Sequence, residues 1–475
     1  MNRRLIKNIS YNTLASFLSI SLGFILNILI ARILQPRQMG YYSYFVWLIG
    51  FLSTIILLGV PNTLTKYISQ YYLKEKEKIR NIFWSLAKIV IISFFVTNFA
   101  VIVYLFFSDK SFHFLIFVFL GVTILVVNAI FRSIVIGLEN FKAVALATLT
   151  SLLLQIFLVI VVLRYIPLWQ MMVWIILTCQ IISTILFFIF IRKEIKFFLK
   201  PDKILSEEIY KVYKYLLYIS LSMLINAIVW ERSEIFFLKI FSVPEDLAFY
   251  SIAFTLAYLP NRILTFGNVL LPFMSRMYSE KEVPTLASYY TQITDVVSFF
   301  LIPVYVFIFA YSFVIIKFLY GVKYLPVADI FKILIFASLI SGITTVGSAY
   351  VQAIEKTDVI FKIGIFIAIV NILLDFLLIP KYKSVGAAYA NSISQILGCF
   401  IGTTYILILH KAKFPFLKVV KYLLSSVVML FILQILNLNQ SLLTFVFYFF
   451  LFFLSYLCLN YKEVYRIINF YKTVR

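Results

Sequence analysis

The stretch Tyr165–Ile191, YIPLWQMMVWIILTCQIISTILFFIFI, contains no charged residue. A helix needs about 20 consecutive apolar residues to cross the hydrocarbon core of a bilayer, so this stretch is long enough to span it. Uncharged runs of similar length recur along the chain at Asn8–Ala31, Gln38–Thr65, Ile89–Ser108, Ala143–Leu163, Val296–Ile316, Ile333–Ile354 and Ser384–His410. The sequence therefore predicts an all-α integral membrane protein.

The composition agrees with this fold class. Hydrophobic residues make up 63% of the 475 positions, only 13% are charged, and the mean hydropathy is +1.01. If runs broken by single charges are counted, and Tyr422–Tyr461 is interpreted as two helices joined by a turn, we expect about 14 transmembrane helices. The continuous apolar runs exclude a transmembrane β-barrel, whose strands would alternate apolar and polar residues.

The net charge of +22 is explained by membrane topology and not by nucleic-acid binding. With the N-terminus in the cytoplasm, most of the 42 Lys and Arg residues fall in cytoplasmic ends and loops, as the positive-inside rule requires. An even number of spans then places both termini in the cytoplasm. We expect a multi-pass protein of the cytoplasmic (plasma) membrane.

The longest water-exposed segment, about Arg192–Lys214, separates six predicted spans from eight. We therefore predict an N-lobe of spans 1–6 (residues 1–191), a cytoplasmic linker (192–213), a C-lobe of spans 7–12 (214–410), and spans 13–14 with a basic tail (411–475). The lobes resemble a repeat. An offset of 208 positions pairs Pro36 with Pro244, and an offset of 216 pairs Glu139 with Glu355. A six-span repeat inserts both copies in the same direction, as in transporters with a site between two lobes.

Three passages resemble the polysaccharide-biosynthesis (Wzx-type) flippases of the multidrug/oligosaccharidyl-lipid/polysaccharide exporter (MOP) superfamily. The first is ARILQPRQMGYYSYF (Ala31–Phe45), in which Gln35 replaces the Gly that is usual before Pro36. The second is ERSEIFFLKIFSVPEDLAFYSIAF (Glu231–Phe254), followed by LPFMSRMYSE. The third is NILLDFLLIPKYKSVGAAYANSIS (Asn371–Ser394). This resemblance implies a flippase that moves a polyprenyl-pyrophosphate-linked oligosaccharide across the membrane by alternating access.

Five cations remain inside predicted spans and are not explained by topology: Lys66, Lys88, Arg132, Arg232 and Arg262. A charge in hydrocarbon costs roughly 3 kcal/mol or more, so each is a functional candidate by default. Phosphate oxygens are best bound by Arg or Lys, and these five are the candidate contacts to the pyrophosphate and headgroup in a cation-lined cavity.

Structural roles stay open for several of these cations. Arg132 shares a helix face with Glu139 and could pair with it instead of contacting an anion. Arg262 could pair with an acid on another helix, and Lys88 is near enough to a span end to snorkel. Pro61 is expected to kink the helix that carries Lys66.

Glu231 and Glu234 are candidates for ion coupling or for counter-ions to a cation. A structural ion-pair network is an equally good interpretation of them. The expected coupling ion is H⁺ or Na⁺, and no other cofactor is expected. Asp295 and Asp375 lie near predicted span ends, where we expect them to be solvated or to cap helices.

Three polar residues are candidates for lining the cavity: Asn27, Asn128 and Tyr258. Asn27 belongs to a stripe of small and polar residues that more often indicates close helix packing. Asn128 and Tyr258 share helix faces with Arg132 and Arg262. The chain has no cluster with metal-ligand spacing, no ATP-binding loop and no nucleophile motif, so we expect neither a metal site nor an enzyme.

Alternative functions follow from the same pattern. An ion-coupled exporter of the multidrug and toxin extrusion type would place acids in its cavity, but the first six spans have no interior acid. A lipid II flippase is disfavoured because the basic motif of that family after span one is missing. A membrane glycosyltransferase or polysaccharide polymerase would need a large loop with catalytic acids, and a scaffold would not need interior cations. Expected partners are the polyprenyl-linked glycan, membrane lipids and glycan-assembly proteins, with the monomer as the functional unit.

Overall fold

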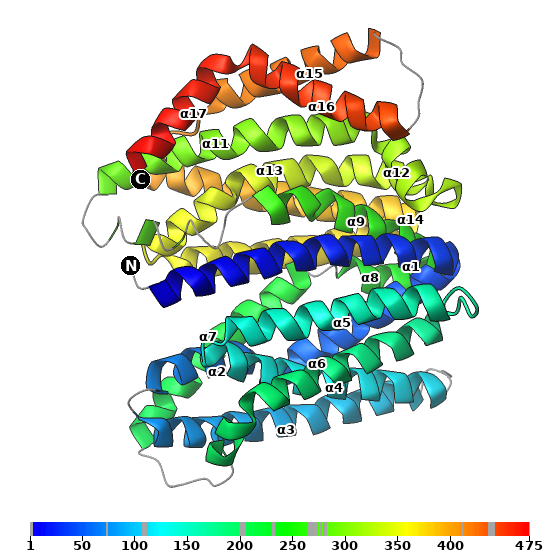
Figure 1. Ribbon diagram of the computed structural model, residues 1–475, viewed down its shortest axis with the longest axis vertical. Coiled ribbons are helices and arrows are strands. Elements are labelled where there is room, and N and C mark those ends of the chain that lie inside the picture. Colours follow the sequence, from blue (N-terminus) through cyan, green and yellow to red (C-terminus); the bar gives the residue numbers. More distant parts are fainter. Residues whose placement is uncertain are drawn as a thin grey trace. The chain divides into compact units, whose positions relative to one another are not determined.

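The computed structural model describes residues 3–72, 75–106, 112–198, 206–229, 233–264, 283–410, 412–435 and 442–474, with single positions between 271 and 278. Every regular element in these ranges is helical (Figure 1). Eight of the helices are long and apolar enough to cross a membrane. The prediction of an all-α membrane protein is confirmed.

The chain divides into two compact units, Met1–Lys239 (unit 1) and Ile240–Arg475 (unit 2). The helices of unit 1 are α1 (Arg3–Leu57), α2 (Val60–Tyr71), α3 (Lys76–Phe106), α4 (Phe112–Gly137), α5 (Phe141–Val162), α6 (Trp169–Phe198) and α7 (Ser206–Val229). Helix α8 (Glu234–Phe241) contains the boundary. The lobe limits expected from the sequence stay a prediction.

The helices of unit 2 are α9 (Pro244–Leu264), α11 (Val283–Ala310), α12 (Ser312–Tyr320), η1 (Val322–Tyr324), α13 (Val327–Ala353), α14 (Thr357–His410), α15 (Phe416–Ile435), α16 (Leu442–Leu459) and α17 (Tyr461–Val474). Helix α13 packs against α9, α11 and α14, while α15 packs along α11. In Figure 1, α11 lies between α13 and the C-terminal helices α15 and α16.

Two helices are long enough to cross a bilayer twice, and both bend at a residue with positive φ. Helix α1 bends at Gln35 (φ 64°, ψ 165°), and α14 bends at Lys383 (φ 51°, ψ −128°). Conformations of this kind strongly favour Gly. At Gln35 this explains why the related motif usually has Gly before its Pro, since the backbone there leaves the helical region.

The helix that carries Lys66 begins after a break and is not kinked at Pro61. Helix α1 ends at Leu57, and Leu58 and Gly59 both have positive φ (42° and 70°) before α2 begins at Val60. Pro61 lies in the first turn of α2, where a missing backbone N–H costs nothing because it would have no helical partner. The predicted kink is therefore a helix start.

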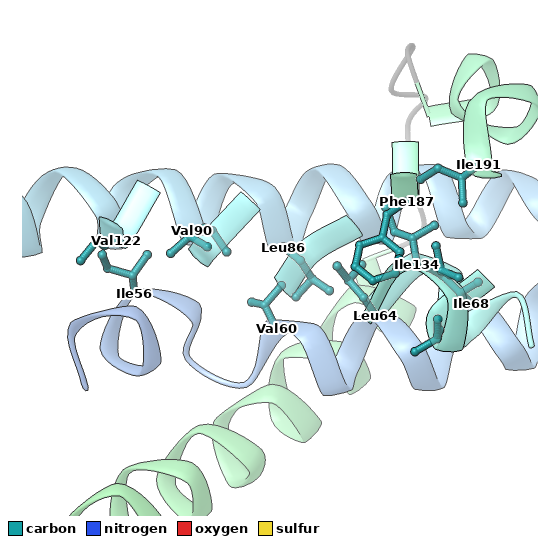
Figure 2. Packing of buried hydrophobic residues seen from close by; sticks show 14 of the residues in the cluster. Ile56, Val60, Leu64, Ile68, Leu86, Val90, Val122, Ile134, Phe187 and Ile191 are labelled. Atoms are coloured by element: carbon teal, nitrogen blue, oxygen red, sulfur yellow. The ribbon is translucent and has the colours of Figure 1, made fainter. Parts of the chain in front are cut away.

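The core of unit 1 is apolar and joins helices that are far apart in sequence. Figure 2 shows side chains from the end of α1 and from α2, α3, α4 and α6 lined up along the helices, with Leu64, Ile134 and Phe187 close together. Helix α7 packs on this group as well, because the Ser220 hydroxyl donates to the Leu58 carbonyl. This apolar core fixes α2 against α4, which sets the level of the cations on both helices.

The residue pair Glu139 and Glu355, matched by the 216-position offset, has the same backbone conformation. Each follows a long helix, α4 or α13, with φ 57° and φ 62° respectively, and each precedes the next helix, α5 or α14. A positive φ at a non-Gly residue is uncommon outside such helix ends. The two equivalent turns support the interpretation of the chain as an internal repeat.

Candidate functional site

Lys66 on α2 and Arg132 on α4 are brought to the same level of unit 1. The Thr65 hydroxyl donates to the Ser133 carbonyl at 3.2 Å. Lys66 follows Thr65 in α2, and Arg132 precedes Ser133 in α4. Gly137 allows the close approach, because a Cβ there would lie 2.8 Å from Ile68 Cβ. Both cationic side chains are exposed. Two exposed cations therefore lie next to the same contact between α2 and α4.

The ammonium group of Lys66 is held on an aromatic ring. Its Nζ lies 3.5 Å from the ring centroid of Tyr215 on α7 and 5.3 Å from that of Tyr67. The two rings meet edge to face, with centroids 6.0 Å apart. A cation over an aromatic face is attracted to the electrons of the ring, so Tyr215 holds the Lys66 ammonium in one position.

Arg132 forms no ion pair with Glu139 in the described part of the chain, although both side chains are described and exposed. The i to i+7 alternative from the sequence is therefore not formed. Glu139 lies in the turn after α4, where its positive φ turns the chain away from the helix axis. Arg132 is exposed on α4 and has no ion-pair partner among the described residues.

The remaining described cations lie on other elements. Lys88 is exposed on α3 of unit 1, and Arg262 is exposed in the last turn of α9 in unit 2. Arg232 and Glu231 lie outside the described residues. The structure thus places Lys66 and Arg132 next to one contact between α2 and α4, and shows Lys88 and Arg262 as separate exposed positions within their own units.

The residues around Arg262 form a polar network inside unit 2. The Asn261 amide donates to the Ser338 carbonyl at 2.7 Å, and the Tyr305 hydroxyl lies 2.9 Å from Asn261 Oδ1. One turn before Arg262 on α9, the buried Tyr258 hydroxyl lies 3.3 Å from Asn391 Oδ1 on α14. Tyr258 therefore joins helices within unit 2, and the network fixes the turn of α9 that carries Arg262.

The other two polar candidates differ in their surroundings. Asn128 donates to the Thr184 hydroxyl at 2.9 Å, so it bridges α4 to α6. Asn27 is half-buried on α1, ahead of the bend at Gln35. Hydrogen bonds between spans are the usual use of Asn in a membrane, so the contact of Asn128 first explains helix packing.

Two of the acids inside the helices are fully buried. Glu234, the first residue of α8, is 0% exposed. Asp375 in α14 is also 0% exposed and accepts a hydrogen bond from Asn371 at 3.0 Å, one turn away. A carboxylate buried in a transmembrane helix is a candidate for binding a proton or a cation.

The expectation that Asp295 and Asp375 are solvated or cap helices is wrong. Both lie inside helices, and Asp295 is only 4% exposed on α11. The reason is tertiary: helices α15 and α17 cover Asp295, and their side chains supply its partners. The spacing Asn371–Asp375, four residues apart on one helix face, is the sequence signal that could have identified the second buried acid.

No group of three or more His, Cys, Asp or Glu side chains in the described ranges could hold a metal ion. Cys179 is buried, Cys399 is half-buried and Cys458 is exposed, and all three are free thiols. The candidate site is therefore built from exposed cations, a polar network and buried acids.

The sequence of this chain matches that of a known family. Residues 5–278 match the family described as polysaccharide biosynthesis protein. The chain belongs to this family. It is also 23% identical over 423 residues to an uncharacterized membrane protein of Methanocaldococcus jannaschii, and the match covers 83% of this chain and 82% of that protein.

The fold is shared with solved transporters. Lipid II flippase MurJ, in an inward closed conformation, superposes with a TM-score of 0.75 at 20% identity, covering 98% of this chain and 99% of that one. An inward-facing multidrug resistance MATE transporter of the MOP superfamily gives 0.64 at 17% identity over 83% and 95%. A MOP superfamily transporter from Pyrococcus furiosus, reported to have a binding pocket of reversed polarity, gives 0.57 at 16% identity over 86% and 96%. The fold predicted from the sequence is confirmed.

Proposed function

We propose that this protein translocates a polyprenyl-pyrophosphate-linked oligosaccharide across the cytoplasmic membrane by alternating access. Its family, polysaccharide biosynthesis, and its likeness in fold to solved transporters support a role in membrane transport. The single observation that carries the proposal is that two exposed cations, Lys66 and Arg132, lie beside the hydrogen bond that joins α2 to α4. Two such groups match the charge of a pyrophosphate, whose oxygens accept several charge-assisted hydrogen bonds.

Arg262 is proposed as a further contact to the headgroup, because the network around Asn261 orients the turn that carries it. Arg232 and Lys88 are proposed as further cations along the path. Each charge-assisted hydrogen bond to phosphate stabilises a complex by about 1.5–3 kcal/mol, so each loss weakens binding at least about tenfold.

The test is transport of a labelled polyprenyl-pyrophosphate glycan in liposomes that contain the purified protein. The Arg132→Ala, Arg262→Ala double variant is expected to lose at least tenfold in rate, and Arg132→Lys to lose less. Lys362→Ala is the matched control, since Lys362 is an exposed cation of α14 paired with Asp358. Unchanged transport in the double variant would rule out the cation-lined path.

Coupling to H⁺ or Na⁺ is proposed to involve the buried acids Glu234 and Asp375, together with Glu231. A buried carboxylate gains stability when it is protonated or when it binds a cation, and this is the property that a coupling site needs. Glu234→Gln and Asp375→Asn are expected to remove the ion dependence of transport. If both variants keep full ion-dependent transport, these acids have no coupling role.

An ion-coupled exporter of organic cations is the second candidate, favoured by the MATE-like fold and the buried acids. For the MOP superfamily transporter from Pyrococcus furiosus, the reversed polarity of the binding pocket suggests a different function. Pocket charge is therefore the discriminating property. If liposomes show efflux of an organic cation that is abolished by Asp375→Asn but unaffected by Arg132→Ala, the exporter replaces the flippase.

A further inference from the structure

A cluster of five charged side chains joins three helices of unit 2. The buried Asp295 on α11 accepts hydrogen bonds from the Tyr422 hydroxyl at 2.8 Å and from Lys418 Nζ at 2.9 Å, and it is paired with Arg466. Glu463 on α17 pairs with Lys421 at 3.1 Å and with Arg466 at 2.8 Å. We name Asp295, Lys418, Lys421, Glu463 and Arg466 the α15–α17 charge cluster.

In this cluster the carboxylates are largely buried and the cations are partly exposed. The side chains of Asp295 and Glu463 are 5% and 14% exposed, while the cations beside them are 38–51% exposed. Three cations face two carboxylates, which leaves one unit of positive charge among these five groups. Each cation also keeps hydrogen-bond donors beyond those used in the cluster, because Lys has three and Arg has five.

The exposed residues near the cluster are of the types expected near a membrane surface. Leu454 and Leu457 are exposed on α16, and Tyr461 and Tyr465 are exposed on α17. Leu side chains suit the hydrocarbon core, and Tyr side chains concentrate at the level of the lipid headgroups. The buried Asn460 lies between the two helices, and its amide donates to the Ser425 hydroxyl at 3.2 Å, which fixes the end of α16 on α15.

Helix α17 has the composition of an interfacial helix. Its sequence, YKEVYRIINFYKTV, combines apolar and aromatic residues with cations. A helix of this kind lies in the plane of the interface, and its cations are attracted to anionic lipids. The ion pairs with α11 and α15 hold the first turns of α17 in one orientation, so the exposed cations of the cluster lie in fixed positions.

We propose that the α15–α17 charge cluster binds the headgroup of an anionic phospholipid of the adjacent leaflet. Lys421 and Arg466 contact its phosphate, with Lys418 as the third cation, and Tyr461 and Tyr465 lie among the neighbouring headgroups. The occupant is a bulk membrane lipid. The site is therefore independent of the transported substrate and of the cations of unit 1.

The test titrates the detergent-solubilised full-length protein with phosphatidylglycerol or phosphatidylcholine and counts bound lipids by native mass spectrometry. Phosphatidylglycerol is expected to bind more tightly. A Lys or Arg near a lipid surface contributes about 1 kcal/mol, so Lys421→Gln should lower the affinity for phosphatidylglycerol about fivefold. Equal binding of the two lipids by the unmodified protein would overturn the proposal.

Opposite effects of two substitutions separate a lipid site from a purely structural cluster. Glu463→Gln removes a carboxylate, frees Lys421 and raises the excess positive charge, so phosphatidylglycerol binding should stay equal or become tighter. A structural role alone would make Lys421→Gln and Glu463→Gln weaken lipid binding alike, and that result overturns the proposal. A thermal unfolding curve for each variant checks that the fold is kept.

Two further controls define the ligand. Lys362→Gln removes a cation that is 76% exposed and paired at 3.6 Å with Asp358 in the same unit, and it should leave the affinity unchanged. An equal loss in this variant would indicate unspecific attraction and overturn the site. Millimolar inorganic phosphate should not compete, and competition by it would identify a small-anion site in place of a lipid site.

Discussion

The charged residues discussed above differ between units 1 and 2 in sign and in exposure. In the described spans of unit 1, Lys66, Lys88 and Arg132 are exposed cations on three helices. In unit 2, Asp295 and Asp375 are buried acids, and each accepts hydrogen bonds from neighbouring side chains. A buried charge needs fixed partners, whereas an exposed one stays available for a ligand. The exposed cations of unit 1 are therefore open to a ligand, whereas Asp295 is held by partners from two other helices of unit 2.

Two of the helices in unit 2 are also more deeply buried than the long helices of unit 1 that carry cations. In α11 and α13 of unit 2, 61% of the most apolar segment is buried, against 17–33% in α3, α4, α5 and α6 of unit 1 and 28% in α14 of unit 2. Dense packing surrounds the polar network of unit 2 and the acid of α11. Exceptions exist on both sides, since Glu234 is buried in unit 1 and Arg262 is exposed in unit 2.

The largest expected effect comes from the buried acid of α11. Asp295→Asn leaves Lys418 and Arg466 without their shared carboxylate and should lower the free energy of unfolding by about 2 kcal/mol, less than for fully buried pairs because both cations are partly exposed. Thermal unfolding in detergent measures this loss. Asp358→Asn, at an exposed ion pair, should cost less than about 0.5 kcal/mol.

The counterpart in unit 1 is Arg132→Gln, which should leave thermal stability within about 0.5 kcal/mol because surface substitutions away from fixed contacts have small effects. If Arg132→Gln destabilised the protein as much as Asp295→Asn, the contrast between the two units would not hold.

A smaller effect is expected from crowding the network that positions Arg262. At Gly342 an added Cβ would collide with Asn261 Oδ1 and would lie 2.8 Å from Leu301 Cδ1. Gly342→Ala should therefore destabilise unit 2 by about 1–2 kcal/mol through overpacking, seen as a lower melting temperature. Gly402→Ala is the matched control, because no atom lies within 4 Å of its added Cβ. Equal melting temperatures for the two variants would mean that α9 and α13 separate easily.

The bend in α1 should respond in the opposite direction. Gln35 has φ 64° and ψ 165°, a conformation that only Gly adopts without strain. Gln35→Gly is expected to raise the free energy of unfolding by about 1 kcal/mol, measured by thermal unfolding. Gln70→Gly, at an exposed helical position of α2, should lower it by a similar amount because Gly weakens helices. A loss of stability in Gln35→Gly would show that the side chain matters more than the backbone strain.

The smallest effect concerns pH and α17. Burial alone would raise the pKa of Glu463, but the hydrogen bond from Lys421 and the charge of Arg466 outweigh it and lower the pKa. A lowered pKa stabilises the folded state above the ordinary Glu value of about 4.3, and this contribution is lost as the pH falls through the lowered pKa. The stability advantage of the unmodified protein over Glu463→Gln should therefore be present at pH 7 and shrink below about pH 4. An advantage that stayed constant with pH would contradict the ion pairing of Glu463.

The long uncharged runs determined that the chain is an all-α membrane protein, because lipid offers no hydrogen-bond partners and the backbone must satisfy itself within helices. The motif around Gln35 and Pro36 indicated the superfamily, and the offset of 216 residues matched two turns with the same φ. These features depend on residues that are close in the chain, so they can be recognised without knowledge of the tertiary contacts. The five interior cations were likewise visible as charges that topology does not explain.

Only the tertiary structure decided which residues lie next to these charges. The Thr65–Ser133 hydrogen bond joins residues 68 positions apart and brings Lys66 level with Arg132. The burial of Asp295 depends on Lys418 and Arg466, which follow it by 123 and 171 positions. Exposure and pairing are properties of packed surfaces. The sequence around a charge near the end of an apolar run does not show whether water or another helix covers that charge.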